Sequence, residues 1–275
     1  NSQNVMIGYS NILENVGIWL WINIKMPILS CMDKPIYPMR INKYLASKKY
    51  CTRRDADEVI KKGKVFINGK LAVLGDKISA TDVVEVKWRA KNHRYFAYNK
   101  PRGIITHSPQ GDDEEDIAMI LPPTLKNVFP LGRLDKDSFG LIILTDDGRI
   151  TDPLLNPEFI HEKEYEVACT TTLPPNFKEK MEAGIDIGLP VRGTQTGGYV
   201  TKPCKIELQS YNKFSIALTE GKKHQIRRMC GSFGLDASGI QRMRIMNIKL
   251  GRIAPGEHRA IQGKELSDFL KALGF

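Results

Sequence analysis

The strongest constraint on this chain is the run Leu131-Gly-Arg-Leu-Asp-Lys-Asp-Ser-Phe-Gly140, which is followed directly by the apolar segment Leu141–Leu144. It places a glycine, an arginine and a carboxylate in four consecutive positions ahead of a segment typical of a short strand. A rigid strand can hold the side chains of an adjoining turn steady, which suits a reactive group. For these four residues alone, an ordinary turn with a solvated Asp135 is the simpler interpretation, so the rest of the chain must decide.

Positive charge is concentrated in one segment. The 275 residues carry a net charge of +10, and the segment from Arg40 to Lys91 holds +8 of it, with fourteen Lys or Arg and six Asp or Glu. Such clustering is the electrostatic signature of a protein that binds a polyanion such as RNA. The alternative is a solvated charged face without a partner, and the clustering of four cations on one short predicted helix argues against it.

The spacing of cysteines and histidines gives no sign of a metal site or of disulfide bonds. The five histidines show no ligand spacing, and no C-x-x-C pair occurs among the five cysteines Cys31, Cys51, Cys169, Cys204 and Cys230. This pattern argues against zinc and against a disulfide framework, and it favours reduced thiols in a cytoplasmic protein.

Residues 1–38 are expected to be an extension outside the core fold. Residues 17–24 are apolar, but they are too few to span a membrane, and no Lys or Arg precedes them as in a signal peptide. A lipoprotein signal ending at Cys31 is the weaker alternative because Asn23 and Lys25 interrupt the apolar run. We therefore expect no membrane association and a folded unit that begins at Met39.

Two short helices are predicted next. Ile41, Tyr44 and Leu45 have the spacing of one helix face, and Thr52 is placed to cap a second helix with Asp55 as its capping-box partner. The second helix directs four cations outward, namely Arg53, Arg54, Lys61 and Lys62.

A hairpin and a strand complete this small α/β module. Residues 65–67 and 71–73 flank the turn Asn68-Gly69, which is typical of a tight hairpin, and residues 82–87 form the last strand. The pattern of residues 39–91 resembles the S4-type RNA-binding module, which implies that the four cations of the second helix contact RNA.

Residues 92–275 are expected to form a second domain with an α+β fold and a mixed sheet, because strands and helices do not alternate strictly. The acidic run 112–116 lies ahead of a short helix at 117–121, where carboxylates are favoured by the helix dipole, so a structural role is preferred over metal binding. The other predicted strands begin at Tyr95 or span residues 104–106, 164–170, 199–208 and 215–219, and the other predicted helices span residues 175–183 and 225–233.

Four segments of this second domain resemble the motifs of the pseudouridine synthases, in the same order. They are Gly132–Asp135, the K-x-Y segment Lys163–Tyr165, the basic run 220–229 and the strand motif 242–251. Behind an S4-like module, they resemble the RsuA, RluB, RluE and RluF family, and most of all its RluF branch, over roughly residues 40–270. The resemblance implies a mainly antiparallel sheet of the pseudouridine synthase type. One departure is His258, which stands where the family usually has a tryptophan.

The resemblance also implies roles for individual residues. Asp135 would be the catalytic carboxylate, Arg227 its charged partner, and Tyr165 the aromatic residue that lies against the target base. Asp137 is a weaker rival of Asp135, and Arg228 would replace Arg227 if the match were shifted by one residue. The remaining contacts to RNA would come from Arg133, Lys163, Arg228 and Ile226, the last packing under the base.

The implied activity is the isomerisation of a uridine to pseudouridine in ribosomal RNA. The RluF-like pattern implies 23S rRNA near the peptidyl-transferase region, with a tRNA anticodon stem as an alternative substrate. The reaction involves neither net redox change nor hydrolysis, so no cofactor or metal is expected, and the lack of a P-loop or G-x-G-x-x-G run agrees. A monomer is expected. A non-catalytic RNA-binding or ribosome-assembly factor is the rival interpretation, which the filled motif positions disfavour.

Overall fold

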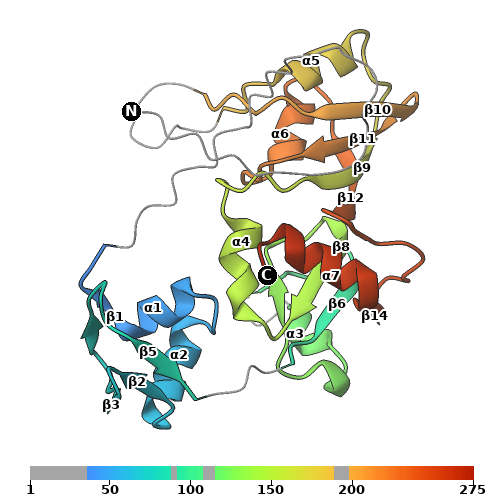
Figure 1. Ribbon diagram of the computed structural model, residues 1–275. Coiled ribbons are helices and arrows are strands. Elements are labelled where there is room, and N and C mark those ends of the chain that lie inside the picture. Colours follow the sequence, from blue (N-terminus) through green and yellow to red (C-terminus); the bar gives the residue numbers. More distant parts are fainter. Residues whose placement is uncertain (1–35, 88–91, 108–114, 189–197) are drawn as a thin grey trace, which may run out of the picture.

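The computed structural model describes residues 36–87, 92–107, 115–188 and 198–275. Figure 1 shows an N-terminal module, coloured blue to teal, beside a larger body built around one sheet. The helix α7 (Gly263–Ala272) crosses in front of this sheet in the same view.

The N-terminal module has the predicted order of elements. Its helices are α1 (Ile41–Ser47) and α2 (Arg53–Lys61), and Thr52 accepts a hydrogen bond from the Asp55 amide at 3.1 Å, as the capping pattern predicted. The strands are β1 (Met39–Arg40), β2 (Val65–Ile67), β3 (Lys70–Leu71), β4 (Lys77–Ile78) and β5 (Val84–Val86). They form a β1–β4 pair and a three-stranded sheet in the order β3-β2-β5.

The hairpin turn of this module is confirmed. Asn68 has φ 51° and Gly69 has φ 77°, so both central residues adopt the left-handed conformation that a two-residue hairpin loop requires. The β1–β4 pair was not predicted, because two-residue strands leave no periodic signal.

The larger body holds a nine-stranded sheet in the order β10-β11-β9-β12-β8-β6-β14, with β13 added to β12 and β7 added to β8. Among the described strands of this sheet, the β12–β8 pair is parallel and the others are antiparallel. The strands are β6 (Tyr95–Lys100), β7 (Phe129–Leu131), β8 (Phe139–Thr145), β9 (Lys163–Cys169), β10 (Lys205–Ser210), β11 (Lys213–Leu218), β12 (Ala237–Ile245), β13 (Ile248–Lys249) and β14 (His258–Ala260). The predicted α+β fold with a mainly antiparallel mixed sheet is confirmed.

Strand β8 is buried on both faces. Leu141 and Ile143 pack with residues of α7 on one face, whereas Ile142 and Leu144 pack on the other face with Ile117. This explains why β8 reads as a continuous apolar run instead of an alternating one. The strand is therefore a rigid support for the loop that precedes it.

The helices lie around this sheet. A separate core joins β9 and β11 to α5 (Phe177–Ala183) and α6 (Gln225–Gly231), through side chains that include Phe177, Phe214 and Met229. The short helices are α3 (Ile117–Ile120), α4 (Thr151–Leu155) and the 3₁₀ turns η1 (Pro123–Leu125) and η2 (Gly148–Ile150).

Several predicted elements differ from the structure. The strand expected at 104–106 is reduced to an isolated bridge between Ile105 and Asp116, and the Thr106 side chain bonds to the Leu134 backbone. The strand expected from 199 begins at Lys205, and Val200 forms only a single bridge. Asp116 does cap α3, accepting from the Met119 amide at 3.0 Å, while most of the acidic run falls outside the described residues. Helices α4 and α7 were not predicted.

Candidate active site

Asp135 lies in the loop between β7 and β8. Gly132 has φ 78°, a conformation that disfavours other residues, so the glycine is what allows the chain to turn out of β7. The neighbouring Leu134 is buried, while 41 % of the Asp135 side chain is exposed. The loop thus presents a carboxylate to solvent from a fixed backbone.

Thr106 holds this loop in place. Its hydroxyl donates to the Leu134 carbonyl at 2.8 Å and accepts from the Leu134 amide at 3.0 Å, so one side chain satisfies both backbone groups of the residue before Asp135. Thr106 is itself only 4 % exposed. Because an unpaired buried backbone group is costly, this reciprocal pair fixes the backbone next to the carboxylate.

Lys100, the last residue of β6, binds the same loop through its side chain. Its side chain is fully buried, and its Nζ donates to the carbonyls of Ser138 at 2.7 Å, Pro101 at 3.0 Å and Lys136 at 3.3 Å. Burial lowers the pKa of Lys100 to about 8, although the nearby carboxylates of Asp135 and Asp137 act in the opposite direction. A buried ammonium group therefore stands close to both carboxylates of the loop.

Arg242 joins the loop to the centre of the sheet. Its Nε donates to the Leu141 carbonyl at 2.6 Å and its Nη1 to the Arg133 carbonyl at 3.3 Å. The parallel pairing of β12 with β8 brings Arg242 opposite Gly140, where an added Cβ would lie 2.5 Å from the Arg242 carbonyl oxygen. The close approach of the two strands therefore requires glycine at 140.

Tyr165 lies on the strand next to Arg242. In the sheet register Tyr165 pairs with Arg242, and Arg242 pairs with Gly140, so the three residues lie across the neighbouring strands β9, β12 and β8. Tyr165 is partly buried and packs against the core that contains Ile226. The sheet thus brings the predicted aromatic residue to the region of the Asp135 loop.

Lys163 carries a perturbed ammonium group in the same region. Its pKa is lowered to about 8, first by burial and then by the positive charge of Arg242. Among the described residues, the Lys163 Nζ donates one hydrogen bond, to the His161 carbonyl at 3.4 Å. A half-buried cation without a carboxylate partner would gain from the arrival of an anionic ligand.

The partner of Asp135 differs from the prediction. His224 Nδ1 lies 3.3 Å from Asp135 Oδ2, whereas Arg227 donates to the Ala237 carbonyl at 2.8 Å. Within the described residues no ion pair joins Arg227 to Asp135, and Arg227 Nη2 is buried without a hydrogen-bond partner. The expected pairing is absent from this arrangement, because α6 directs the Arg227 side chain towards the start of β12.

A buried network positions His224. Glu220 is 5 % exposed and accepts from Gln225 Nε2 at 2.9 Å, from the Lys202 amide at 2.9 Å and from the Tyr199 hydroxyl. His224 itself adopts φ 53°, a left-handed conformation at the N-terminus of α6. These contacts fix the turn that carries His224 towards Asp135.

The other predicted residues lie around this centre or in the N-terminal module. Arg133 is exposed beside Asp135, while Arg228 donates to the Ile187 carbonyl at 3.3 Å. All four cations of α2 are exposed, and Lys61 forms an ion pair with Glu58 at 2.9 Å.

Sequence reasoning missed four residues of the site: Lys100, Thr106, His224 and Arg242. Lys100 had one available signal, since it ends a predicted strand directly before Pro101, where an exposed lysine is the ordinary expectation. His224 and Arg242 stood inside recognised motifs without an assigned role. For Thr106 we find no sequence signal.

The described part of the chain contains no group of three or more His, Cys, Asp or Glu side chains suited to a metal ion. None of its helices is long and apolar enough to cross a membrane.

Comparisons with known proteins agree with this geometry. A model of the RNA pseudouridylate synthase family matches residues 94–232, and a model of the S4 domain matches residues 39–84. The chain is 40 % identical over 240 residues to the dual-specificity RNA pseudouridine synthase RluF of Salmonella typhi, covering 85 % of this chain and 79 % of the relative.

Two further matches have similar coverage. The RluF of Escherichia coli (strain K12) is 38 % identical over 245 residues, covering 87 % of this chain and 81 % of the relative. A crystal structure of a pseudouridylate synthase aligns with a TM-score of 0.59 at 28 % identity, covering 86 % of this chain and 99 % of the other.

Proposed function

This chain belongs to the RNA pseudouridylate synthase family and carries the S4 module of its RluF-like members, and from this premise we propose that it isomerises one specific uridine of ribosomal RNA. The observation that carries the proposal is the position of Asp135, an accessible carboxylate on a loop that is fixed by Thr106, Lys100 and Arg242. Such a preorganised carboxylate is suited to attack or proton transfer at a bound nucleotide.

Asp135 is assigned the central catalytic role. The reaction breaks the N1–C1′ glycosidic bond, turns the base and rejoins it through C5. C5 loses its proton and N1 gains one, either directly or through solvent. An ionised Asp135 attacks the base or the sugar, or takes a proton from the sugar. The Lys100 ammonium group and the His224 imidazole both lie close to this carboxylate.

The target uridine is expected to leave its RNA helix. An enzyme that acts on a base must take it out of the stack and replace the lost contacts with its own side chains. Tyr165 and Ile226, which belong to one apolar cluster beside the loop, are assigned this role. Tyr165 is also assigned the transfer of a proton at C5 or at the sugar.

Cations around the site are assigned to the RNA backbone. Arg133 lies in the Asp135 loop, Lys163 is the first residue of β9, and Arg228 lies on α6 next to Arg227. We propose that Arg227 turns from the Ala237 carbonyl to Asp135 when the base is bound, since its Nη2 has no partner in the described structure. The cations Arg53, Arg54, Lys61 and Lys62 of α2 would anchor the flanking RNA.

The finer substrate assignment rests on the relatives. We propose 23S rRNA near the peptidyl-transferase region as the substrate, with a tRNA anticodon stem as the alternative, as the RluF-like sequence pattern implies. The identity of 38–40 % to proteins named dual-specificity RNA pseudouridine synthase RluF supports placing the chain in this branch. We further propose that residues 39–91 form the RNA-binding domain and residues 92–275 the catalytic domain. The protein is proposed to be a cytoplasmic monomer whose reaction needs no cofactor.

The test is a map of pseudouridines in total RNA from cells with and without this protein. One uridine of 23S rRNA should lose its modification in the deletion strain and regain it with the wild-type protein. Asp135→Asn should fail to restore it, whereas Asp137→Asn, which removes the exposed carboxylate two residues away, should restore it. A map that is unchanged by the deletion would favour a non-catalytic RNA-binding factor.

A further inference from the structure

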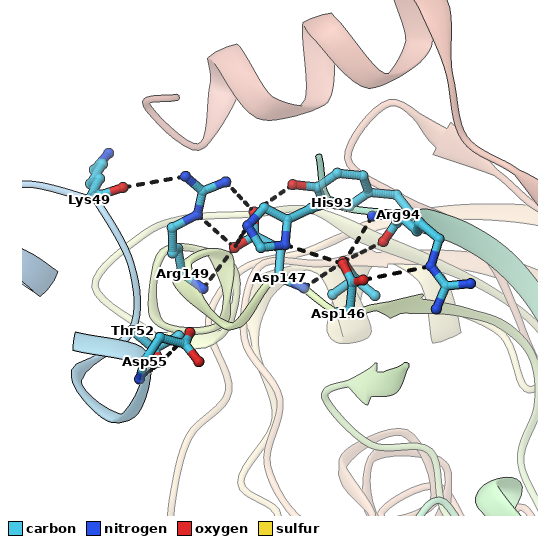
Figure 2. A network of polar contacts seen from close by, with 10 residues as sticks. Lys49, Thr52, Asp55, His93, Arg94, Asp146, Asp147 and Arg149 are labelled. Atoms are coloured by element: carbon cyan, nitrogen blue, oxygen red, sulfur yellow. Dashed lines mark hydrogen bonds and ion pairs between the residues drawn. The ribbon is translucent and has the colours of Figure 1, made fainter. Parts of the chain in front are cut away.

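Among the described residues, the N-terminal module contacts the catalytic domain at the corner that carries Arg149. The loop between α1 and α2, residues 48–52, meets the corner between β8 and α4, residues 146–149, and the end of α7. Figure 2 shows the polar part of this contact, with the Lys49 carbonyl directed towards Arg149.

Arg149 is the centre of the contact. Its guanidinium forms a bidentate pair with Asp147, with Nε and Nη2 each 2.7 Å from a carboxylate oxygen. Its Nη1 reaches across to the Lys49 carbonyl at 3.4 Å, and its guanidinium lies over the Phe275 ring. One planar side chain therefore links the catalytic domain to the backbone of the N-terminal module.

The base of this link is rigid. Asp147 is fully buried, and it accepts a hydrogen bond of 2.5 Å from the Tyr95 hydroxyl in addition to the pair with Arg149. Burial opposes ionisation of Asp147, but the hydrogen bonds from Arg149 and Tyr95 outweigh it and hold its pKa below the ordinary value. His93 Nδ1 lies 3.2 Å from Asp146, so the first described residues after the linker are tied to the same corner.

The Lys49 side chain of the N-terminal module also contacts the catalytic domain. Its Nζ donates to the Gly274 carbonyl at 2.7 Å and lies 4.4 Å from the centre of the Phe275 ring. Lys49 has φ 59°, so the α1–α2 loop is shaped to present both its carbonyl and its ammonium group to the catalytic domain.

Packing is close where the two parts meet. A Cβ added at Gly148 would lie 2.5 Å from Cγ2 of Thr52, and Gly148 has no positive φ that would itself require glycine. Thr52 is the N-cap of α2, so the helix that carries Arg53 and Arg54 begins at the contact. The positions of Arg53 and Arg54 therefore depend on how Thr52 packs against Gly148.

We propose that this contact is a latch that docks the RNA-binding module at a fixed distance from Asp135, with Arg149 as its positioning residue. The proposal rests on the proposed function, in which α2 binds RNA. Strand β8 joins the two places, since Asp135 precedes it and Asp147 follows it, and seven strand residues span about 23 Å. A structured RNA that reaches both ends gains affinity because its second contact is intramolecular.

The docked geometry has a direct test that needs no RNA. The distance from an ideal Cβ at Gly148 to Cβ of Thr52 is 3.8 Å, which matches the ordinary Cβ–Cβ distance of a disulfide. The double variant Thr52→Cys with Gly148→Cys should therefore form an intramolecular cross-link under mild oxidation, identified by peptide mass spectrometry. Each single variant is the control. Failure of the pair to cross-link in the folded protein overturns the latch.

The positioning role is tested with a rescue pair. Gly148→Ala should raise KM for an rRNA transcript by about tenfold, with kcat unchanged, because the module is pushed out of register while Asp135 is not touched. Thr52→Ser removes the clashing Cγ2 but retains the capping hydroxyl, so the double variant should return to the wild-type KM. A loss of stability alone would not produce this split between KM and kcat.

Two further comparisons separate the outcomes. Lys49→Ala should raise KM more than Lys48→Ala, which removes the same charge from the neighbouring exposed residue. If the cross-link forms but Gly148→Ala, with or without Thr52→Ser, leaves KM unchanged, the positioning role is wrong. If the wild-type protein forms no pseudouridine in any RNA, the proposed function fails, while the cross-link still reports on the latch.

Discussion

The imidazole of His224 is the side chain that faces Asp135, with Nδ1 3.3 Å from Oδ2, although the neighbouring segment carries two arginines. Both partners are about two-fifths exposed, at 42 % and 41 %, so the pair is open to a ligand and is screened by water. Arg227 lies one turn further along α6 and donates to the Ala237 carbonyl instead. In the proposed function, Asp135 faces His224 before RNA binds and Arg227 afterwards.

Arg227→Ala is expected to lower kcat by about 100-fold or more with little change in RNA affinity, if Arg227 turns to Asp135 in the complex. His224→Ala should cost less, about tenfold in kcat, because its contact with Asp135 is exposed. The matched control is Arg228→Ala, which should weaken RNA binding in a salt-dependent way. Single-turnover kinetics on an rRNA transcript measure both quantities, and normal turnover in Arg227→Ala would remove that residue from the site.

Thr106→Val should disable the enzyme without touching Asp135. The substitution keeps the shape of the side chain but leaves the buried amide and carbonyl of Leu134 without their partner, at a cost of about 1–3 kcal/mol. We expect a lower midpoint of urea unfolding and a lower kcat. Thr106→Ser retains the hydroxyl and should behave like wild type, so equal losses in both variants would mean that the lost methyl contacts matter, not the hydrogen bonds.

Lys100→Met should reveal the buried charge through the pH dependence of stability. The pKa of Lys100 is about 8 in the folded protein and about 10.5 when unfolded, so between these values the unfolded chain binds more protons. The contribution of Lys100 to stability must therefore rise with pH from about 8 to 10.5, and stay constant below 8. Thermal unfolding of the two proteins from pH 7 to 10 should show wild type gaining relative to Lys100→Met. A constant difference would contradict the lowered pKa.

Turnover supplies a second measure of Lys100. Methionine fills the space but donates no hydrogen bond to Pro101, Lys136 or Ser138, so the loop should lose its fixed position. We expect a fall in kcat at pH 7 with RNA binding close to wild type.

The sequence predicted local structure well wherever a short pattern determines it. The Asn68-Gly69 turn and the Thr52 cap follow from backbone chemistry within four residues, and both are present. Periodicity and turn residues likewise located several elements of the catalytic domain to within a few residues, among them β9, α5 and α6. Helix α7 is not among the predicted elements, although Leu266, Phe269, Leu270 and Leu273 have helical spacing and pack into the core.

The arrangement of the site could not be predicted in the same way. Lys100 and Thr106 act on a loop about thirty residues away, and Arg242 acts from more than one hundred residues away, so their roles exist only once β6, β8 and β12 are paired. The sequence motif placed an arginine near Asp135 but could not fix its side-chain direction. That direction depends on where α6 lies relative to β12, which is set by the apolar core around Met229.

The cations of α2 should contribute unequally to RNA binding, although the sequence presents them alike. Arg53 and Arg54 have no ion pair in the described structure, whereas Lys61 is paired with Glu58 at 2.9 Å. A phosphate that contacts Lys61 must compete with this carboxylate, so Lys61→Gln should weaken binding less than Arg53→Gln or Arg54→Gln. Each arginine variant should lower the slope of log affinity against log salt by about one unit.

Filter binding of an rRNA transcript at several salt concentrations measures the slopes. Glu58→Gln should strengthen RNA binding if Glu58 competes with phosphate for Lys61. In the Glu58→Gln background, Lys61→Gln should then lower RNA affinity as much as an arginine variant does. Equal slopes for all the single variants in the wild-type background would instead show that the ion pair does not restrain Lys61.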